Sequence, residues 1–362
     1  MKLFPALEKK YSKEQMSALD AQRLAHEISC APIVFHVSRQ MLKSGILQML
    51  VNAKEGLTLD EVVEKTKMSK YACKCLLESS LTIGTVLFQD GRFSCSKAGW
   101  FLLNDPMVNV NIDFNHDVNY LGLLHLEEAL LNGKPEGLNV FGNWINIYEA
   151  LTQLPEQARK SWFRFDHYYS DQSFDEALQI VFENKPKTLL DVGGNTGRWA
   201  LRCVDYSADV QVTIMDLPQQ ISLMKQNIAD KNGADRIHGY CCNLLDKTVQ
   251  FPSDFNAIWL SQFLVCFSED EVTSILSRAS QSMNADSKLY IMETFWDRQR
   301  FETAAYVLTQ ISIYFTALAN GNSKMFHSDD MIHCIENAGL TIEEIKDGIG
   351  KGHSIVICKK SK

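Results

Sequence analysis

The stretch Thr188-Leu-Leu-Asp-Val-Gly-Gly-Asn-Thr-Gly-Arg-Trp-Ala-Leu201 decides the fold of this chain. An apolar run typical of a buried strand leads directly into a glycine-rich turn, and helix-forming residues follow the turn. Glycines in such a turn adopt positive φ and let the backbone approach a ligand closely. Asn195 stands where a further glycine would also be suitable, and Asn tolerates the left-handed conformation better than most residues. This order of strand, tight turn and helix predicts an α/β fold with a parallel sheet.

Two carboxylates beside this turn indicate which ligand it binds. The next predicted strand, Val210–Met215, ends in Asp216, where a carboxylate reaches ribose hydroxyls. A dinucleotide motif would need a glycine at Arg198, and the Gly-Lys-Ser/Thr of a phosphate-binding loop is absent. Asp191 would repel a diphosphate but attract an ammonium group such as that of methionine. The sequence therefore predicts S-adenosylmethionine, rather than NAD, as the cofactor.

Composition restricts the class of protein further. The chain has 362 residues, 46% of them hydrophobic and 22% charged, which is long enough for two domains. Its net charge of −8 argues against a general nucleic-acid binder. The ten cysteines lack zinc-ligand spacing, so we predict free thiols and no metal site. With no apolar signal segment and no long apolar run, we expect a cytoplasmic protein without membrane contact.

The N-terminal third predicts short helices followed by a hairpin, which is the order of a winged helix. Apolar residues at helical spacing predict one long helix within residues 14–50. Thr58 and Glu61 form the signature of a capping box, and Ser69 is a suitable N-cap for a third helix. The turn Gln89-Asp90-Gly91 between two short apolar runs predicts the hairpin.

Winged helices often bind DNA, but the lysines here do not favour that function. Lys65, Lys67, Lys70 and Lys74 lie in or just before the third helix, and on an acidic chain they indicate a solvated face. The apolar side chains between Ile33 and Leu50 exceed what one small domain needs to bury. We therefore predict a homodimer formed through this domain, and no nucleic-acid partner.

Short β-rich runs alternate with helical runs in the C-terminal half. Such alternation predicts βαβ units and a mainly parallel sheet, closed by a final antiparallel pair. We predict three regions: a dimerisation domain at 1–105, a helical linker contributing to the substrate pocket at 106–180, and a Rossmann-like domain at 181–362. The expected strands are Thr188–Val192, Val210–Met215, Ile237–Cys242, Ala257–Leu260, Lys288–Glu293, Thr341–Lys346 and His353–Lys359.

The segment from Asp191 to Gly197, together with Asp216-Leu217-Pro218, resembles the DVGGGTG…DLP signature of small-molecule O-methyltransferases of the plant caffeate and acetylserotonin type. That family joins a winged-helix dimerisation domain to a Rossmann-like class I methyltransferase domain, so the resemblance covers nearly the whole chain. It implies S-adenosyl-L-methionine as cofactor and a small-molecule acceptor. The cofactor-binding residues indicated by the motif and the resemblance are Asp191, Gly193, Gly194, Asn195, Gly197, Asp216, Leu217, Asn243, Leu244 and Ser261.

The acceptor pocket is also predicted from this resemblance. The segment Phe165–Ser173 is similar to the family's FxxxM helix over the cofactor, with Tyr169 at the methionine. A helix over Thr303–Leu318 resembles the family's substrate helix and is expected to cap the pocket. A flat, apolar acceptor would suit the predicted pocket residues Phe165, Tyr169, Phe263, Phe315 and Met325, with Phe295 and Phe326 in nearby segments.

The sequence departs from the family at its proton-abstracting residues. The family's general-base histidine falls on Val265, its neighbouring aspartate on Cys266, and the later glutamate on Met325. Valine and methionine cannot accept a proton, so the family's base cannot be carried over. Substitute bases are His167, in the segment over the cofactor, and then His327.

These observations favour methyl transfer to a hydroxyl of a small aromatic acceptor. Because alignment of the acceptor alone lowers the barrier, transfer does not require a strong base. One alternative is C-methylation of an activated phenol ring. A second is a cofactor-binding protein that has lost catalysis, as Val265 would suggest. A third is a winged-helix regulator that senses the cofactor, which the net charge disfavours.

Overall fold

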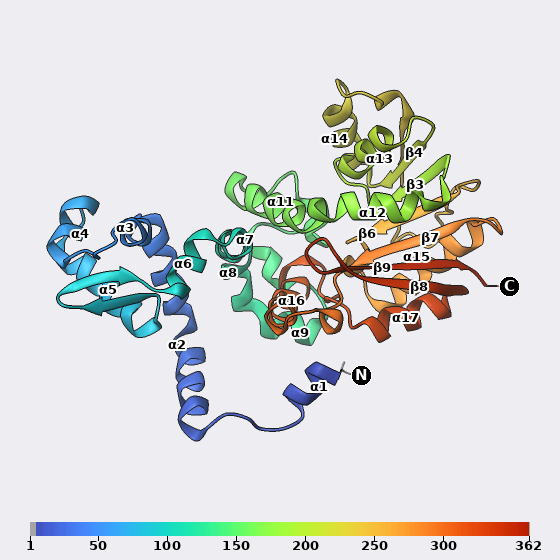
Figure 1. Cartoon of the computed structure of the whole chain (residues 1–362). Helices are drawn as coiled ribbons and strands as arrows, with labels where there is room; N and C mark the ends of the chain where they lie inside the picture. The colour runs from blue at the N-terminus through green and yellow to red at the C-terminus, as the bar shows by residue number, and fades with distance from the viewer. Residues whose placement is uncertain (1–4, 362) are drawn as a thin grey trace. The chain divides into compact units, whose positions relative to one another are not determined.

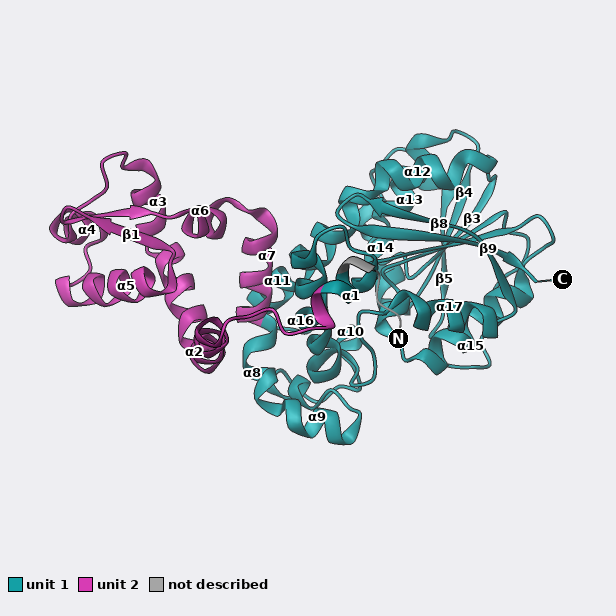
Figure 2. Cartoon of the chain, turned by 60° about the horizontal axis from the view of Figure 1, so that its bottom comes forward, with its two compact units in different colours: residues 1–9, 118–362 teal, residues 10–117 magenta. Residues whose placement is uncertain are grey.

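The chain forms two compact units, which Figure 2 distinguishes by colour. The computed structural model describes residues 5–361. One unit spans Lys10–Asp117, and the other spans Val118–Lys362 together with the N-terminal residues up to Lys9. Across residues 5–361, every helix is too short or too polar to cross a lipid bilayer.

The smaller unit packs its helices and hairpin around one apolar core. Its elements are α2 (Ala18–Lys43), α3 (Ile46–Asn52), α4 (Leu59–Thr66), α5 (Lys70–Ile83), β1 (Val86–Gln89), β2 (Arg92–Cys95), α6 (Lys97–Asn104) and α7 (Pro106–Phe114). Local sequence signals set the starts of α4 and α5 and the turn of the hairpin as predicted. Thr58 and Glu61 form the capping box of α4, and Ser69 caps α5 by accepting from the N–H of Ala72. Asp90 and Gly91 turn the hairpin with positive φ.

The prediction of a single long helix within residues 14–50 was wrong. The structure instead has α2 and α3, which are separated by Ser44 and Gly45. Gly45 has a φ of +74°, a left-handed conformation that ends a helix and is readily adopted by glycine. The apolar spacing continues through this break because Met41, Ile46 and Leu47 all enter the same core.

The larger unit is built on a seven-stranded sheet of order β5-β4-β3-β6-β7-β9-β8 (Figure 1). The first five strands in this order pair in parallel, and β9 pairs antiparallel with both β7 and β8, as predicted. The strands are β3 (Thr188–Val192), β4 (Gln211–Asp216), β5 (Ile237–Cys241), β6 (Ala257–Ser261), β7 (Lys288–Glu293), β8 (Leu340–Ile349) and β9 (His353–Lys360).

Helices cover both faces of this sheet, because its central strands are apolar on both sides. The helices of this unit are α8 (Tyr120–Gly122), α9 (Leu126–Asn132), α10 (Ile147–Ala150), α11 (Glu156–Ser170), α12 (Phe174–Val181), α13 (Arg198–Tyr206), α14 (Pro218–Ile228), α15 (Glu269–Ser282), α16 (Glu302–Tyr314) and α17 (Ser328–Asn337). Leu189 of β3 enters a core with α12, α13 and α14, while Leu190 enters the opposite core with α15 and α17. This arrangement confirms the predicted Rossmann-like α/β architecture.

Candidate active site

The glycines of the β3–α13 loop are required by close packing. A Cβ atom on Gly193, whose φ is +74°, would lie 2.2 Å from Cδ2 of Phe263. A Cβ on Gly194 would lie 2.5 Å from Oδ2 of Asp191. Asn195 adopts a φ of +50°, and Gly197 begins α13 with a φ of +83°. The loop therefore lies directly over the carboxylate at the end of its own strand.

Asp216, at the end of β4, is tied to this loop by its carboxylate. Its Oδ2 accepts a hydrogen bond from the backbone N–H of Asn195 at 2.9 Å, and its Oδ1 accepts one from Leu217 at 2.7 Å. Burial raises the pKa of Asp216 to about 6, although these two hydrogen bonds act in the opposite direction. The two predicted carboxylates thus lie under one loop.

Asp191 is a buried acid without a counterion. It is 2% exposed, and its Oδ2 has no hydrogen-bond partner among the described residues. Burial, together with the nearby charge of Asp216, raises its pKa to about 8. A buried polar atom without a partner destabilises a protein unless a ligand completes it. The environment of Asp191 therefore suits a cationic group.

A cavity opens at the carboxyl ends of β3, β4, β5 and β6, where ligands bind in open α/β sheets. The empty space at this site is about 1680 Å³ when its mouth, open to solvent, is included. Gly197 and His327 do not line it. The predicted site residues in its wall are Phe165, His167, Tyr169, Asp191, Gly193, Gly194, Asn195, Asp216, Leu217, Asn243, Leu244, Ser261, Phe263, Phe315 and Met325.

The cavity also collects unpaired polar atoms. Twelve fully buried side-chain polar atoms lack a hydrogen-bond partner among the described residues, and eight of the twelve belong to residues of its wall. Such atoms are rare in native proteins, so these side chains are suited to hydrogen bonding with a bound ligand or with water. The eight residues are Tyr148, His167, Asp191, Asn195, Trp199, Gln220, Trp259 and Gln262.

Within residues 5–361, no three His, Cys, Asp or Glu side chains are grouped to hold a metal ion.

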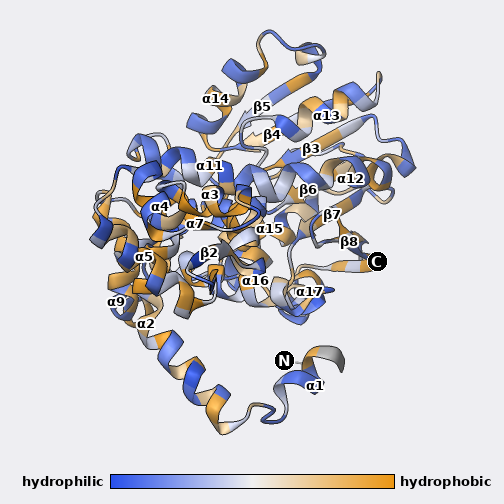
Figure 3. Ribbon diagram, turned by 60° about the vertical axis from the view of Figure 1, so that its left-hand side comes forward, coloured by the Kyte–Doolittle hydropathy of each residue, from blue (hydrophilic) through white to orange (hydrophobic). Residues whose placement is uncertain are grey.

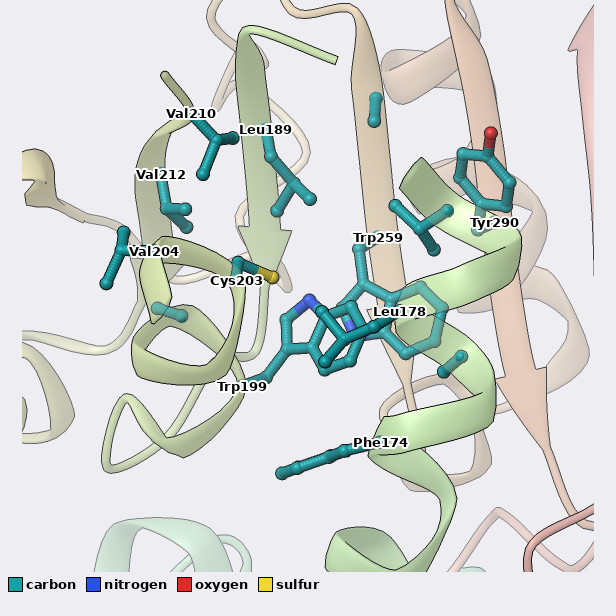
Figure 4. Packing of buried hydrophobic residues seen from close by; sticks show 14 of the residues in the cluster. Phe174, Leu178, Leu189, Trp199, Cys203, Val204, Val210, Val212, Trp259 and Tyr290 are labelled. Carbon is teal, nitrogen blue, oxygen red and sulfur yellow. The ribbon is translucent and has the colours of Figure 1, made fainter. Parts of the chain in front are cut away.

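Aromatic rings form much of the remaining wall. The rings of Trp199 and Trp259 stack with centroids 4.4 Å apart, and Phe174 packs against Trp199 (Figure 4). On α11 and α16, Trp162 donates a hydrogen bond from Nε1 to the hydroxyl of Tyr314 at 2.7 Å. The sequence analysis did not predict these five wall residues, because the elements that bring them together are far apart in the chain.

The two predicted bases occupy different environments. His167 lies in the cavity wall, and burial lowers its pKa, so its imidazole is favoured in the neutral form. His327 is 3% exposed and caps α17, where its Nδ1 accepts from the N–H of Asp329 at 3.0 Å. His327 therefore has a structural contact outside the cavity.

Glu293, which the sequence analysis did not single out, holds the backbone around Val265 by hydrogen bonds. Oε1 of Glu293 accepts hydrogen bonds from the backbone N–H groups of Leu264 and Val265 at 2.9 and 3.3 Å. Burial raises the pKa of Glu293 to about 8, although these hydrogen bonds lower it. The available signal was an acid at the end of an otherwise apolar strand. Val265 itself is buried in the cavity wall, beside Cys266.

Comparison with known protein families identifies the family of this chain. The sequence model of the O-methyltransferase domain family matches residues 123–339, well over half of the chain. The chain belongs to this family. A Dimerisation2-like domain matches residues 22–93, within the smaller unit. This O-methyltransferase-family protein is therefore an S-adenosylmethionine-dependent methyltransferase with an N-terminal dimerisation domain, as the sequence predicted.

Similar proteins agree with this assignment. The chain is 20% identical over 323 residues to the L-tyrosine C(3)-methyltransferase of Streptomyces lavendulae, with 87% of each sequence covered. The S-adenosylmethionine-dependent methyltransferase SibL superposes with a TM-score of 0.70 at 19% identity, covering 93% of this chain and 98% of SibL. Human N-acetylserotonin methyltransferase in complex with SAM gives 0.66 at 15% identity, covering 97% and 99%. At these identities, the two structures show the shared fold.

Proposed function

We propose that this methyltransferase transfers the methyl group of S-adenosylmethionine to a hydroxyl of a small, uncharged aromatic acceptor. The observation that carries this proposal is the two-sided cavity. One side has two acids under a glycine loop, and the other has aromatic rings. When bound, the cofactor supplies a methyl group already activated by its sulfonium charge. The protein must then align the acceptor, exclude water and accept a proton.

The residues under the loop fit the cofactor. Asp191, with its unpaired Oδ2, would hold the ammonium group, and Asp216 would hold the ribose hydroxyls. Asn243 and Leu244, just after β5, would flank the adenine. Several buried polar atoms without partners would gain hydrogen bonds from such a ligand.

Charge in the wall favours an uncharged acceptor. Arg198 is the one arginine or lysine among the described wall residues, and it pairs with Asp171 at 2.7 Å. The wall has five carboxyl groups, on Glu149, Asp166, Asp171, Asp191 and Asp216. An acceptor with its own carboxylate would enter this site without an unpaired cationic side chain to neutralise it, at an electrostatic cost. A neutral phenol would fill the aromatic side without that cost.

C-methylation of a phenol ring is a second candidate function. The relative from Streptomyces lavendulae that shares 87% of this chain's length is a tyrosine C(3)-methyltransferase, while the matching family model is an O-methyltransferase domain. Both reactions use a phenol, and both need a proton acceptor. A cavity with an aromatic wall is compatible with either product.

Turnover of phenols with labelled methyl donor tests the function. We expect the purified full-length protein to methylate neutral phenols or catechols. The product is identified by fragmentation in mass spectrometry, which separates an aryl methyl ether from a ring-methylated phenol. Ring methylation would overturn O-methylation in favour of the second candidate. Binding of S-adenosylhomocysteine without turnover of any phenol would overturn the acceptor assignment.

We also infer that the enzyme is a homodimer formed through its smaller unit. Residues 18–33 of α2 are exposed, and they include large apolar side chains at Leu19, Leu24, Ile28 and Ile33. Apolar and polar residues alternate in patches along this helix (Figure 3). A helix with so many uncovered apolar side chains favours burial against a second copy. The match to a Dimerisation2-like domain supports this inference.

The smaller unit gives less support to DNA binding. Lys70 pairs with Asp60 at 2.6 Å, and Lys74 lies 3.7 Å from Glu78, so carboxylates accompany two of the four lysines. All ten cysteines are free thiols, which suits a reducing compartment such as the cytoplasm. We therefore infer a cytoplasmic enzyme whose partner is a small molecule rather than a nucleic acid.

A further inference from the structure

Several acids of the cavity wall already have a partner or a place at the cofactor loop. Asp191 and Asp216 lie under that loop, and Asp171 is paired with Arg198. Val265, where the family has its base, offers no proton-accepting atom. Of the acid and imidazole groups on α11, the helix that lines the cavity, Asp166 and His167 are the ones in its wall.

Asp166 lies between the cofactor loop and the acceptor side of the cavity. Its Oδ2 accepts a hydrogen bond from Nδ2 of Asn195 at 3.3 Å, which ties the carboxylate to the loop. Its Oδ1 has no hydrogen-bond partner among the described residues. Unlike the unpaired polar atoms described above, this oxygen is not completely buried. On the other side, its charge helps to raise the pKa values of Tyr148, Cys266 and Tyr314, all in the aromatic part of the wall.

The surroundings of Asp166 give it a proton affinity suited to its position. Burial and the nearby charge of Asp171 raise its pKa to about 7, while Arg198 and the hydrogen bond from Asn195 act in the opposite direction. A base whose pKa lies near the working pH both accepts a proton from the acceptor and returns it to water. An ordinary surface aspartate, with a pKa near 4, would be a much weaker base.

His167 is less well placed than its neighbour. Successive side chains on an α-helix diverge by about 100°, so the two residues do not face the same point. The ring of His167 packs near Phe163, with centroids 5.8 Å apart, and its Nε2 is fully covered by protein. Oδ1 of Asp166, in contrast, is not among the completely buried unpaired atoms.

We propose that Asp166 is the general base that takes the acceptor's proton, through Oδ1. This inference rests on the proposed function. The hydroxyl oxygen forms its bond to the methyl carbon and loses its proton to Asp166. The electrons of the broken carbon–sulfur bond remain on the sulfur, and water later removes the proton from Asp166. The loss of the family's histidine at Val265 is thereby compensated from a different helix.

Ligand binding tests the position of Asp166 without any acceptor. Sinefungin is an analogue of the methyl donor that carries a protonated amine in place of the methylsulfonium. If the Asp166 carboxylate faces the transferred methyl, calorimetry at pH 8 should show that wild type prefers sinefungin to S-adenosylhomocysteine. Asp166→Asn should reduce that preference about tenfold or more, because an opposite charge nearby shifts such equilibria by one to three powers of ten. Asp175→Asn, at an exposed acid of α12, removes the same charge outside the cavity and should leave the preference unchanged.

The outcomes of this binding test are distinct. An unchanged preference in Asp166→Asn would overturn the assignment of Asp166 alone. Equal weakening of both ligands would also overturn it, because the residue would then act only on the structure of the loop. Failure of wild type to bind either ligand would reject the proposed function itself, and the role of Asp166 with it.

Kinetics with phenols of decreasing pKa provide a second test. Asp166→Asn should lower kcat about 100-fold or more with an ordinary phenol, the usual contribution of a general base. The deficit should shrink as the acceptor becomes acidic enough to ionise in water. His167→Gln, measured in parallel, compares the two candidate bases. The proposal would be overturned if His167→Gln lost the roughly 100-fold in kcat while Asp166→Asn kept the kcat and pH profile of wild type.

Discussion

The backbone N–H of Asn195 donates a hydrogen bond to Oδ2 of Asp216 over 2.9 Å, which joins the loop after β3 to the end of β4. Asn195 donates this bond from a left-handed backbone conformation with a φ of +50°. Gly reaches that conformation without strain, whereas a β-branched residue does not. The loop is therefore positioned by backbone conformation as well as by its side chains.

Substitutions at Asn195 should separate these two contributions. Asn195→Gly keeps the backbone N–H and should bind S-adenosylhomocysteine within a few-fold of wild type. Asn195→Val should weaken binding about tenfold or more, because the required φ is strained by about 1–3 kcal/mol. Calorimetry on both variants measures the difference. Equal affinities for the two would show that loop conformation does not control the site.

The buried acids predict that the ligand-free enzyme loses stability as the pH rises. The pKa values of Asp191 and Glu293 are each raised to about 8, above the unfolded carboxyl values of about 4. Their contribution to stability is therefore complete below about pH 4 and is lost as the pH rises through 8. Glu293→Gln keeps an oxygen for the N–H groups of Leu264 and Val265 but cannot ionise.

Thermal unfolding at pH 6 and pH 9 measures this effect. The melting temperature of Glu293→Gln minus that of wild type should be several degrees higher at pH 9 than at pH 6. The exposed variant Asp175→Asn serves as a control and should show no such change. A difference for Glu293→Gln that is the same at both pH values would contradict the buried ionisation.

Charge on the exposed face of α2 should break the proposed dimer. Ile28 is 66% exposed and lies in the stretch without cover from its own chain. Ile28→Asp would place a desolvated charge in the interface, so light scattering coupled to size exclusion should show a monomer. Tyr206→Asp, at an exposed aromatic residue of the other unit, is the matched control. A wild-type protein that is monomeric at micromolar concentration would contradict the dimer.

The acidic wall predicts discrimination between neutral and anionic acceptors. For a phenol active as its methyl ester, the free carboxylic acid should have a kcat/KM at least about tenfold lower, because the described wall has no unpaired cationic side chain. Parallel assays of ester and acid at pH 7.5 measure the ratio. Preference for the acid would mean that the wall's charge does not select the acceptor.

Much of this enzyme's fold was predictable because its signals are local. The capping box at Thr58 and Glu61 and the glycine bend after β3 each depend on a few adjacent residues. The break at Gly45 was missed because apolar spacing continues across it. Periodicity reports which side chains are buried, and one glycine between two buried segments leaves that pattern intact.

The chemical part of the site was harder to predict. Asp216 and Asp191 follow from strand ends, but the surroundings of Asp166 depend on how α11 packs over the loop. The stacking of Trp199 on Trp259 likewise joins residues 60 positions apart. Such contacts are set by tertiary packing, which one sequence does not reveal.

The most direct test of the central claim is calorimetry of the full-length protein with S-adenosylhomocysteine. Wild type should bind it in the micromolar range, and Asp216→Ala should abolish detectable binding by removing the ribose contact beneath the loop. Asp191→Asn should weaken binding by removing the charge that faces the ammonium group. Absence of binding by wild type, or undiminished binding by Asp216→Ala, would contradict the account.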